Sequence, residues 1–422
     1  MMRNSYQAII MQQNTLHRNA SMIVFFRSVD LTSWAAAGLA LGAGWLAFNS
    51  PILNEYGTPQ LFMAGAAILV MAWRLGARTR LAAWAILAAW YLGAGSAMPS
   101  GWQAFFNNNL GWAGWAIWAG VAASPVLLFP ARLAPYALGG GTLLAALTPV
   151  GMMSPILAAA GFFPGGGWWG LAGAMAVLML PSIPNKKLFA MAGILVVFWG
   201  AVQNAAFDAK PMSLPDDVWA VETREGAQPS LAVDWFGRQG RVSGLARDGV
   251  EHGARLTVTP EGAVDAWDVW AKVAWEDVAA ASRRQGGMVL LGIYRKTASG
   301  WQNGLLDVAS GEIYGATVPM PISMWRPWSK EGHFPFDLSQ ITRRIKTPVG
   351  EAAYLICFEE LLVFPMAAKM ASGHPAMLIS AANQWFTNAE TAEAQERSVQ
   401  QQARLWGLPI LRAVNWAKEA DH

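Results

Sequence analysis

The sequence predicts two regions in one chain, a multi-span α-helical membrane domain followed by an α/β domain. First, the chain is 54% hydrophobic and only 14% charged, whereas soluble domains carry about 25% charged residues. Second, the charge is uneven: residues 1–207 contain nine Lys or Arg and only two acids, Asp30 and Glu55. Third, beyond Asp208 short apolar runs alternate with amphipathic helical patterns, which favours α/β layers. The net charge of +3 is small and scattered, which argues against a nucleic-acid partner.

Seven apolar stretches before residue 207 approach the length of a transmembrane helix, about 20 residues. Six or eight spans remain compatible with the pattern. The stretches are 32–49, 59–75, 80–97, 110–129, 134–160, 165–182 and 187–206. We therefore divide the chain into an N-terminal segment (1–31), a membrane domain of about seven transmembrane helices (32–206) and a globular domain (207–422).

The loops between these stretches predict the orientation of the protein. Basic residues lie before the first stretch and in alternate loops, and the intervening loops contain none. They are Arg3, Arg18, Arg27, Arg74, Arg78, Arg80, Arg132, Lys186 and Lys187. Because Lys and Arg accumulate on the cytoplasmic side, we expect a cytoplasmic N-terminus. An odd number of spans then places the globular domain outside, in the periplasm of a Gram-negative bacterium whose inner membrane holds the protein.

Strands and helices alternate in the globular domain. Period and composition predict strands at 230–236, 254–261, 287–295, 352–360 and 375–386, and helices at 268–285 and 388–407. Catalytic groups of α/β sheets tend to follow the carboxyl ends of strands. Glu261 ends one predicted strand, and Cys357, the only cysteine, lies near the end of another.

Each candidate also has a simpler interpretation. Glu261 could be a solvated loop carboxylate. A lone cysteine in an apolar strand is often a small buried hydrophobic residue. Glu359 and Glu360, which follow the cysteine, could be ordinary acids at a helix N-terminus, where the helix dipole favours them. The order of these signals along the chain is what favours a catalytic site.

Four short blocks resemble, in order, motifs of the carbon–nitrogen hydrolase (nitrilase) superfamily. They are TPEGA (259–263), ICFEE (356–360), SAANQWF (380–386) and LPILRAVN (408–415). A multi-span block ahead of such a domain resembles apolipoprotein N-acyltransferase. The segment PMPISMWRPW (319–328), together with CFEELLVFP, is similar to the conjugal-transfer TraB proteins, a plasmid-borne branch of that family. The resemblance covers nearly the whole chain.

The resemblance implies a nitrilase-like α-β-β-α sandwich and a catalytic set of Glu, Lys and Cys. Cys357 would be the nucleophile that forms a thioester, which divides acyl transfer into two easier steps. Glu261 would be the general base that takes the thiol proton and returns it to the leaving group. A lysine ammonium would lower the pKa of the thiol and stabilise the oxyanion.

Further roles follow from the same blocks. The backbone N–H of Phe358 would contribute to the oxyanion hole, and Glu359 would orient the residues around the cysteine. Asn383 and Trp385, in the Asn-x-Trp-Phe block, would border the acyl pocket.

The lysine is where this chain departs from the acyltransferases. If Tyr314 and Pro321 are matched to their lysine block, Ala316 occupies the position of the lysine. A different register offers Lys330, which could equally be a solvated loop lysine, and Arg326 is a third way to supply a cation.

The sequence therefore predicts a Cys-dependent acyltransferase or amidase that acts on a membrane lipid or an amide and is linked to conjugal transfer. The alternative is a catalytically weakened nitrilase-like module that binds conjugation-apparatus or envelope proteins. We expect no cofactor, and the five histidines show no metal-ligand spacing.

Overall fold

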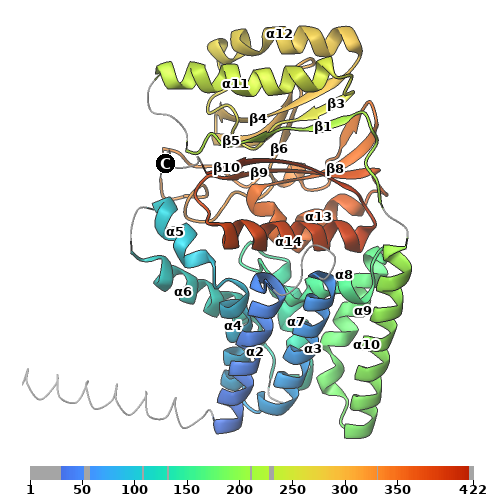
Figure 1. The fold of residues 1–422 in the computed structure, drawn as a ribbon. Helices are drawn as coiled ribbons and strands as arrows, with labels where there is room; N and C mark the ends of the chain where they lie inside the picture. Colours follow the sequence, from blue (N-terminus) through green and yellow to red (C-terminus); the bar gives the residue numbers. More distant parts are fainter. Residues whose placement is uncertain are drawn as a thin grey trace, which may run out of the picture.

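A computed structural model describes residues 30–51, 58–106, 109–130, 133–209, 212–227, 232–329 and 331–417. Figure 1 shows a bundle of helices at one end of the molecule and a two-sheet α/β region at the other. The last bundle helix, α10, spans Lys186–Asp208. The first strand of the sheets, β1, spans Val218–Ala220. The change of structure falls where the charge density of the sequence changes.

The first region consists of apolar helices. They are α2 (Leu31–Asn49), α3 (Thr58–Gly76), α4 (Arg80–Ala94), α5 (Met98–Phe106), α6 (Gly111–Ala123), η2 (Ser124–Leu128), α7 (Ala134–Ala146), η4 (Pro155–Ala158), α8 (Ala159–Phe162), α9 (Gly167–Leu178), η5 (Leu180–Ser182) and α10. Within the described residues, four helices are long and apolar enough to cross a membrane, and up to six spans result if each of two bent helix pairs is one span. These helices indicate membrane association.

The apolar stretch at 134–160 does not form one helix. The chain leaves helix α7 at Ala146, and η4 and α8 follow only from Pro155. Proline cannot continue a helix because it lacks the N–H donor; Pro149 lies in this break, and Pro155 is the first residue of η4. The segment from Pro155 to Phe162 then meets the next helix at a bend of 118°. That the chain crosses the membrane about seven times therefore stays a prediction.

Three of the segments predicted to share the cytoplasmic side lie together at one end of the bundle. Asp30, before α2, forms an ion pair of 2.9 Å with Arg78 in the loop after α3. Arg74 donates hydrogen bonds to the carbonyl oxygens of Pro181 (2.7 Å) and Pro184 (2.9 Å), before α10. This end lies away from the sheets (Figure 1). The arrangement agrees with basic residues on one side; the identity of that side is still a prediction.

The second region contains two mixed five-stranded sheets. Sheet A has the order β1, β3 (Leu256–Val258), β4 (Met288–Thr297), β5 (Gly300–Asp307) and β6 (Ile313–Gly315). Sheet B has the order β2 (Glu222–Thr223), β10 (Ile410–Trp416), β9 (Met377–Gln384), β8 (Gly350–Ile356) and β7 (Ile345–Thr347). Strands β1, β3 and β4 are parallel, as are β2, β10, β9 and β8, and the remaining pairs are antiparallel.

Three apolar cores hold the α/β region together. Leu290 and Leu305 of sheet A share one core with Ile379 and Leu411 of sheet B. A second core lies between sheet A and helices α11 (Ala232–Glu251) and α12 (Val269–Gln285). On the other side of sheet B lie α13 (Val363–Met370) and α14 (Ala389–Trp406), between the sheet and the bundle (Figure 1). Their buried side chains belong to the same apolar core as the bundle helices, so the two regions pack as one body.

One predicted strand is wrong. The segment 230–236 was expected to be a strand, but a helix begins at Ala232 and continues to Glu251. Three of its buried apolar side chains, Val242, Ala246 and Val250, are four residues apart and are each no more than 1% exposed. This spacing is the period of a helix face, and the short window of the strand prediction did not include it.

The other predicted elements are present. The strands expected at 254–261, 287–295, 352–360 and 375–386 correspond to β3, β4, β8 and β9, and the two helices correspond to α12 and α14. The predicted strand at 352–360 ends early, because β8 stops at Ile356 and a 3-10 turn, η7 (Cys357–Leu361), follows. The long strand β5, which carries a residue of the candidate site, was not predicted.

Candidate active site

Glu261 and Cys357 meet between the two sheets. Glu261 follows β3 of sheet A by three residues, and Cys357 follows β8 of sheet B directly. The thiol lies close to the Glu261 carboxyl group, near enough for each group to shift the pKa of the other. Glu261 is only 3% exposed, so the interpretation as a solvated loop carboxylate is wrong. Cys357 is partly buried and has a carboxyl partner, which distinguishes it from a purely apolar core residue.

The backbone of Cys357 adopts a conformation that a non-glycine residue rarely takes. Its φ is +50°, in the left-handed region, which costs roughly 1–2 kcal/mol for an L-residue. Two hydrogen bonds hold the turn: Gln395 Nε2 donates to the Cys357 carbonyl (3.1 Å), and the backbone N–H of Ile356 donates to Glu359 Oε2 (3.1 Å). Strain of this kind is typical of functional turns, and here it places the thiol at the end of β8.

The Glu261 carboxyl group has the environment of a general base. Asn303 Nδ2 on β5 donates to its Oε1 (2.6 Å), and the Tyr294 hydroxyl on β4 lies 3.4 Å from the same oxygen. Burial raises the pKa of Glu261 to about 7, and the hydrogen bonds from Cys357, Asn303 and Tyr294 limit the rise. A base with a pKa near the working pH accepts and returns a proton efficiently.

The thiol of Cys357 is not activated in the surroundings that the structure describes. Burial raises its pKa well above the ordinary value, and the negative charge of Glu261 and the hydrogen bond with it raise the pKa further. The backbone N–H of Asn383, near the sulfur, lowers the pKa of the thiol and opposes this rise. At neutral pH the site therefore holds a thiol beside a carboxyl group that is close to half ionised.

Glu359 connects the cysteine turn to the neighbouring loop. Besides Ile356, the backbone N–H groups of Thr317 (2.8 Å) and Val318 (3.2 Å) donate to its carboxylate. Glu359 is fully buried, and burial raises its pKa, while the ammonium of Lys369 lowers it. Glu359 therefore joins the turn to the loop after β6, in addition to its capping contact with Ile356. Its expected orienting role stays a prediction.

Lys369 is a buried cation behind this turn. It is 0% exposed. Its Nζ donates to the carbonyl of Gln340 (3.0 Å) and lies 4.1 Å from the centroid of the Tyr354 ring. Burial lowers the pKa of Lys369, and the charge of Glu359 opposes that. These partners place the ammonium beside β8 and Glu359, and no described contact joins it to the thiol.

Glu360 belongs to a second buried network, on the α14 side. Its carboxylate accepts hydrogen bonds from Ser380 Oγ (2.5 Å) and Gln395 Nε2 (2.8 Å) and lies 3.5 Å from Arg412 Nη2. Burial raises the pKa of Glu360, and Arg412 lowers it. Because Gln395 also donates to the Cys357 carbonyl, this network supports the strained turn.

The Asn-x-Trp-Phe block lies beside the cysteine. Asn383, at the end of β9, accepts a hydrogen bond on its side-chain oxygen from Asn415 Nδ2 (2.8 Å). Trp385 packs against Phe105 of α5, with ring centroids 5.9 Å apart, and against Phe386. This end of β9 therefore contacts the helix bundle, and the pocket role of Trp385 stays a prediction.

No lysine or arginine among the described residues forms a hydrogen bond or ion pair with Cys357 or Glu261. Ala316, which occupies the expected lysine position, is 9% exposed and lies beside Asn303, whose carbonyl accepts its backbone N–H (2.8 Å). Arg326 is bound within its own loop, where its Nη2 donates to the Gly332 carbonyl (2.8 Å). Lys330 lies outside the described residues. Among the described residues, no group of three or more His, Cys, Asp or Glu residues is placed to hold a metal ion.

An apolar cavity of about 550 Å³ adjoins the cysteine turn on the side of the helix bundle. Helices α5 and α6 contribute Trp102 and Ile117 to its lining, the loop after β6 contributes Met320, and η7 contributes Phe358 and Leu361. Phe358 is the residue directly after Cys357. The predicted oxyanion role of its backbone N–H stays a prediction, while its side chain borders this cavity.

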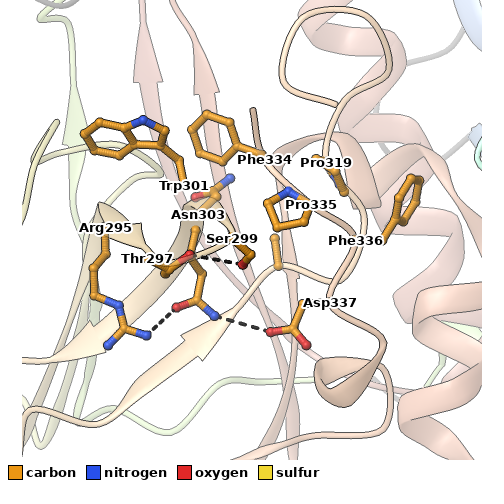
Figure 2. A pocket seen from close by; sticks show the side chains of 12 residues that line it. Arg295, Thr297, Ser299, Trp301, Asn303, Pro319, Phe334, Pro335, Phe336 and Asp337 are labelled. Carbon is orange, nitrogen blue, oxygen red and sulfur yellow. Dashed lines mark hydrogen bonds between the residues drawn. The ribbon is translucent and has the colours of Figure 1, made fainter. Parts of the chain in front are cut away.

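A polar pocket of about 400 Å³ adjoins the site at Asn303. Figure 2 shows Arg295, Trp301, Asn303 and Asp337 around it, together with aromatic and proline side chains of the segment 334–336. Asn303 belongs to both the pocket and the site, because its Nδ2 contacts Glu261. Asn303 and Tyr294 were not predicted from the sequence, since neither lies in a recognisable motif. The strand character of 300–307 was the only available signal.

Comparison with known proteins finds two similar conjugation proteins. The chain is 28% identical over 375 residues to the "Conjugal transfer protein TraB" of Agrobacterium fabrum, covering 80% of this chain and 84% of that protein. It is 26% identical over 355 residues to the "Probable conjugal transfer protein TraB" of Sinorhizobium fredii, covering 80% and 89%. No protein-family model matches the chain. The resemblance to TraB proteins is confirmed at this level of identity, whereas the resemblance to apolipoprotein N-acyltransferase stays a prediction.

A solved structure, a mutant of the Nesterenkonia AN1 amidase from the nitrilase superfamily, is also similar to this chain. Its TM-score is 0.33 at 14% sequence identity, and the match covers 49% of this chain and 79% of that one. This structural likeness is weak.

Proposed function

We propose that the protein takes an acyl group from a membrane lipid, holds it as a thioester on Cys357 and transfers it to an amine or to water. The observation that carries the proposal is the apolar cavity between the helix bundle and the cysteine turn. Its lining joins α6 of the bundle to Phe358, directly beside the nucleophile. A carbonyl at the end of an acyl chain in this cavity would meet the thiol.

The size and position of the cavity suit a lipid chain. Its volume of about 550 Å³ falls within the roughly 300–1,000 Å³ of small-molecule sites. Ile117, which contributes to the lining, is 67% exposed on the surface of the bundle. An apolar helix surface of this kind is where bilayer chains would lie, so a lipid tail can enter from the membrane without crossing water.

The groups around the cysteine support acyl transfer in two steps. Glu261 takes the thiol proton as the sulfur attacks the ester carbonyl, and the carbon–oxygen bond of the lipid breaks as Glu261 returns the proton to the departing alkoxide. In the second step Glu261 takes a proton from the acceptor as its nitrogen or oxygen bonds to the thioester carbonyl carbon. The carbon–sulfur bond then breaks, and Glu261 returns the proton to the departing thiolate. The role of Glu261 is supported by its pKa of about 7 and its contact with the thiol.

The proposal includes the nitrilase-like α-β-β-α arrangement, the periplasmic position of the globular domain and the inner membrane. Their support is the pair of facing sheets with helices on both outer sides (Figure 1) and the clustering of basic loops at the far end of the bundle. The names of the two TraB relatives link the activity to conjugal transfer.

A second candidate is a binding module of the conjugation apparatus without catalytic activity. The observation that favours it is the raised pKa of the Cys357 thiol, with no cation bound to it among the described residues. Such a module would keep the fold and the contacts with envelope proteins while the thiol stays protonated and unreactive.

Formation of the acyl-enzyme tests the proposal and separates the two candidates. The full chain is placed in vesicles of dipalmitoyl phosphatidylethanolamine and phosphatidylglycerol, and its intact mass is measured. We expect a gain of one palmitoyl group, removable by neutral hydroxylamine and missing in Cys357→Ala. Because Cys357 is the only cysteine, any thioester adduct reports on this residue. If no adduct forms in wild type, in wild type with a primary amine added, or in an Ala316→Lys variant, the acyl-transfer function is refuted.

The cavity itself is tested by filling it. Ala113 lines the cavity on α6, and Ala116, on the same helix, does not belong to its lining. We expect Ala113→Trp to slow acylation by long-chain lipids at least tenfold and to spare a short-chain ester such as p-nitrophenyl acetate. Ala116→Trp, the matched control, should leave both rates near wild type. Equal loss with both donors would argue against a chain-binding cavity.

A further inference from the structure

The polar pocket has an unfilled hydrogen-bond acceptor next to the general base. Asn303 is 7% exposed and lines the pocket. Its Nδ2 donates a hydrogen bond to Glu261 Oε1 (2.6 Å), while its Oδ1 has no hydrogen-bond partner among the described residues. A buried acceptor without a partner costs about 1–3 kcal/mol. The side chain is therefore ready for a donor that enters the pocket.

The charges and rings around the pocket suit a small cation. Asp337 contributes a carboxylate whose Oδ2 has only a long contact, 3.4 Å, with Gln302 Nε2. Trp301 and Phe334 contribute aromatic rings (Figure 2), and aromatic faces attract ammonium groups. Arg295 also lines the pocket, but it is exposed and its guanidinium donates to Gln302 Oε1 (2.7 Å). Because solvent screens an exposed charge, Arg295 repels a bound cation only weakly.

No positively charged side chain among the described residues contacts the thiol next to this pocket. Every group that contacts Cys357 or Glu261 among the described residues is either neutral or a carboxyl group. Attack on a carbonyl creates a thiolate and then an oxyanion, and a nearby cation stabilises both. A small side chain, Ala316, lines the pocket beside Asn303, so there is space for a cation where no described lysine or arginine contacts the thiol.

We infer that the polar pocket binds the primary ammonium group of the acyl acceptor, and that this ammonium activates Cys357 before it is acylated. The inference rests on the proposed acyl-transfer function and names its acceptor as a primary amine. The ammonium donates one hydrogen bond to Asn303 Oδ1 and lies among Asp337, Trp301 and Glu261. The acceptor thus supplies a charge at the site in the first step and its nitrogen in the second.

The protons balance in this sequence. With the ammonium in place, Glu261 takes the thiol proton, the sulfur forms the thioester, and the departing alkoxide takes the proton from Glu261. The Glu261 carboxylate next takes one proton from the ammonium. The neutral amine then attacks the thioester, the carbon–nitrogen bond forms, the carbon–sulfur bond breaks, and the second nitrogen proton goes to the thiolate. Glu261 releases its proton to solvent, so one proton is released in each turnover.

Alkylation of the sole cysteine by iodoacetamide tests the inference without any lipid. The full chain in detergent is labelled at about pH 7, and the rate is followed by intact mass in propylammonium chloride, tetramethylammonium chloride or sodium chloride at equal ionic strength. We expect propylammonium to raise the rate at least fivefold with saturation. Tetramethylammonium should leave the rate unchanged because it has no N–H to donate to Asn303.

Three variants sharpen the test. Asn303→Leu should abolish the propylammonium effect, and Asp337→Asn should raise the concentration for half saturation several-fold. Ala316→Lys should label quickly with no amine and gain nothing when it is added. The elution volume and thermal unfolding of each variant are compared with wild type to show that it is folded.

The outcomes separate this inference from the proposed function. Equal rates in propylammonium and tetramethylammonium overturn the ammonium pocket, as does an unchanged response in Asn303→Leu. If the pocket fails this test and palmitoyl-Cys357 still forms from vesicles, acyl transfer stands with another source of activation. If propylammonium raises alkylation but no acyl-enzyme forms under any condition, the ammonium site stands and the lipid donor is wrong.

Discussion

Replacement of Glu261 by glutamine should make the protein more stable at high pH. The carboxyl group is 3% exposed, and burial raises its pKa from 4.5 to about 7. The folded state therefore holds this proton more tightly than the unfolded chain does. Below about pH 4.5 both states are protonated and the group contributes nothing. As the pH rises toward 7, the unfolded chain loses the proton first, so wild-type stability falls through this window.

The size of the effect follows from the shift. One pKa unit corresponds to about 1.36 kcal/mol, so a rise of roughly 2.5 units costs the wild type about 3 kcal/mol once both states are ionised. Between about pH 5 and 8 the change is about 2.5 kcal/mol. Glutamine cannot ionise and can still accept the hydrogen bond from Asn303. Any constant cost of the substitution shifts the whole profile and leaves its slope with pH untouched.

Thermal unfolding of both proteins in the same detergent measures this difference, with tryptophan fluorescence as the signal. At roughly 2–4 °C per kcal/mol for a region of this size, the melting temperature of Glu261→Gln should gain about 5–10 °C on that of wild type between pH 5 and pH 8. The conservative change Glu351→Gln, at a carboxylate 37% exposed, controls for surface effects. Parallel profiles for wild type and Glu261→Gln would refute a buried carboxyl group with a raised pKa.

Two further substitutions test how the site is held. A Cβ at Gly292 of β4 would lie 1.9 Å from the Pro260 carbonyl oxygen and 2.9 Å from the Glu261 Cα. Gly292→Ala should therefore destabilise the protein by roughly 1–3 kcal/mol and slow acylation of Cys357. The control, Gly240→Ala in α11, where a Cβ meets nothing within 4 Å, should be neutral or stabilising. Gln395→Leu removes the donor to the Cys357 carbonyl and to Glu360 and should cost about 1–3 kcal/mol in denaturant unfolding; an unchanged midpoint would show that the turn is held without it.

The sequence predicted those features that depend on local pattern. The charge distribution located the two regions, and the strand ends at Glu261 and Cys357 are where the structure has them. Both residues belong to short segments whose period and neighbours are visible in the chain. The strand predicted at 230–236 failed for a related reason: the helix period of Val242, Ala246 and Val250 appears only over a longer window.

The rest of the site depends on contacts between distant segments. Asn303 reaches Glu261 from β5 across 42 positions in the sequence, and Gln395 reaches the Cys357 carbonyl from α14 across 38. Lys369 is a basic residue in a short amphipathic helix, and only the packing of α13 under sheet B buries it. Asn303 and Gln395 are uncharged and belong to no motif or periodic pattern that would distinguish them from surface residues. Such residues become visible only when the sheets are placed face to face.

The three buried carboxyl groups around the thiol, Glu261, Glu359 and Glu360, differ in how their negative charge is balanced. Glu360 has Arg412 at 3.5 Å, and Glu359 has three backbone N–H donors and the field of Lys369. Glu261 has only neutral donors among the described residues. A buried charge without a partner is expensive. The cost can be removed by a proton, which fits a pKa of about 7, or by a cation from outside the chain. Among these three carboxyl groups, Glu261 is thus the one whose protonation the proposed ligand of the polar pocket would control.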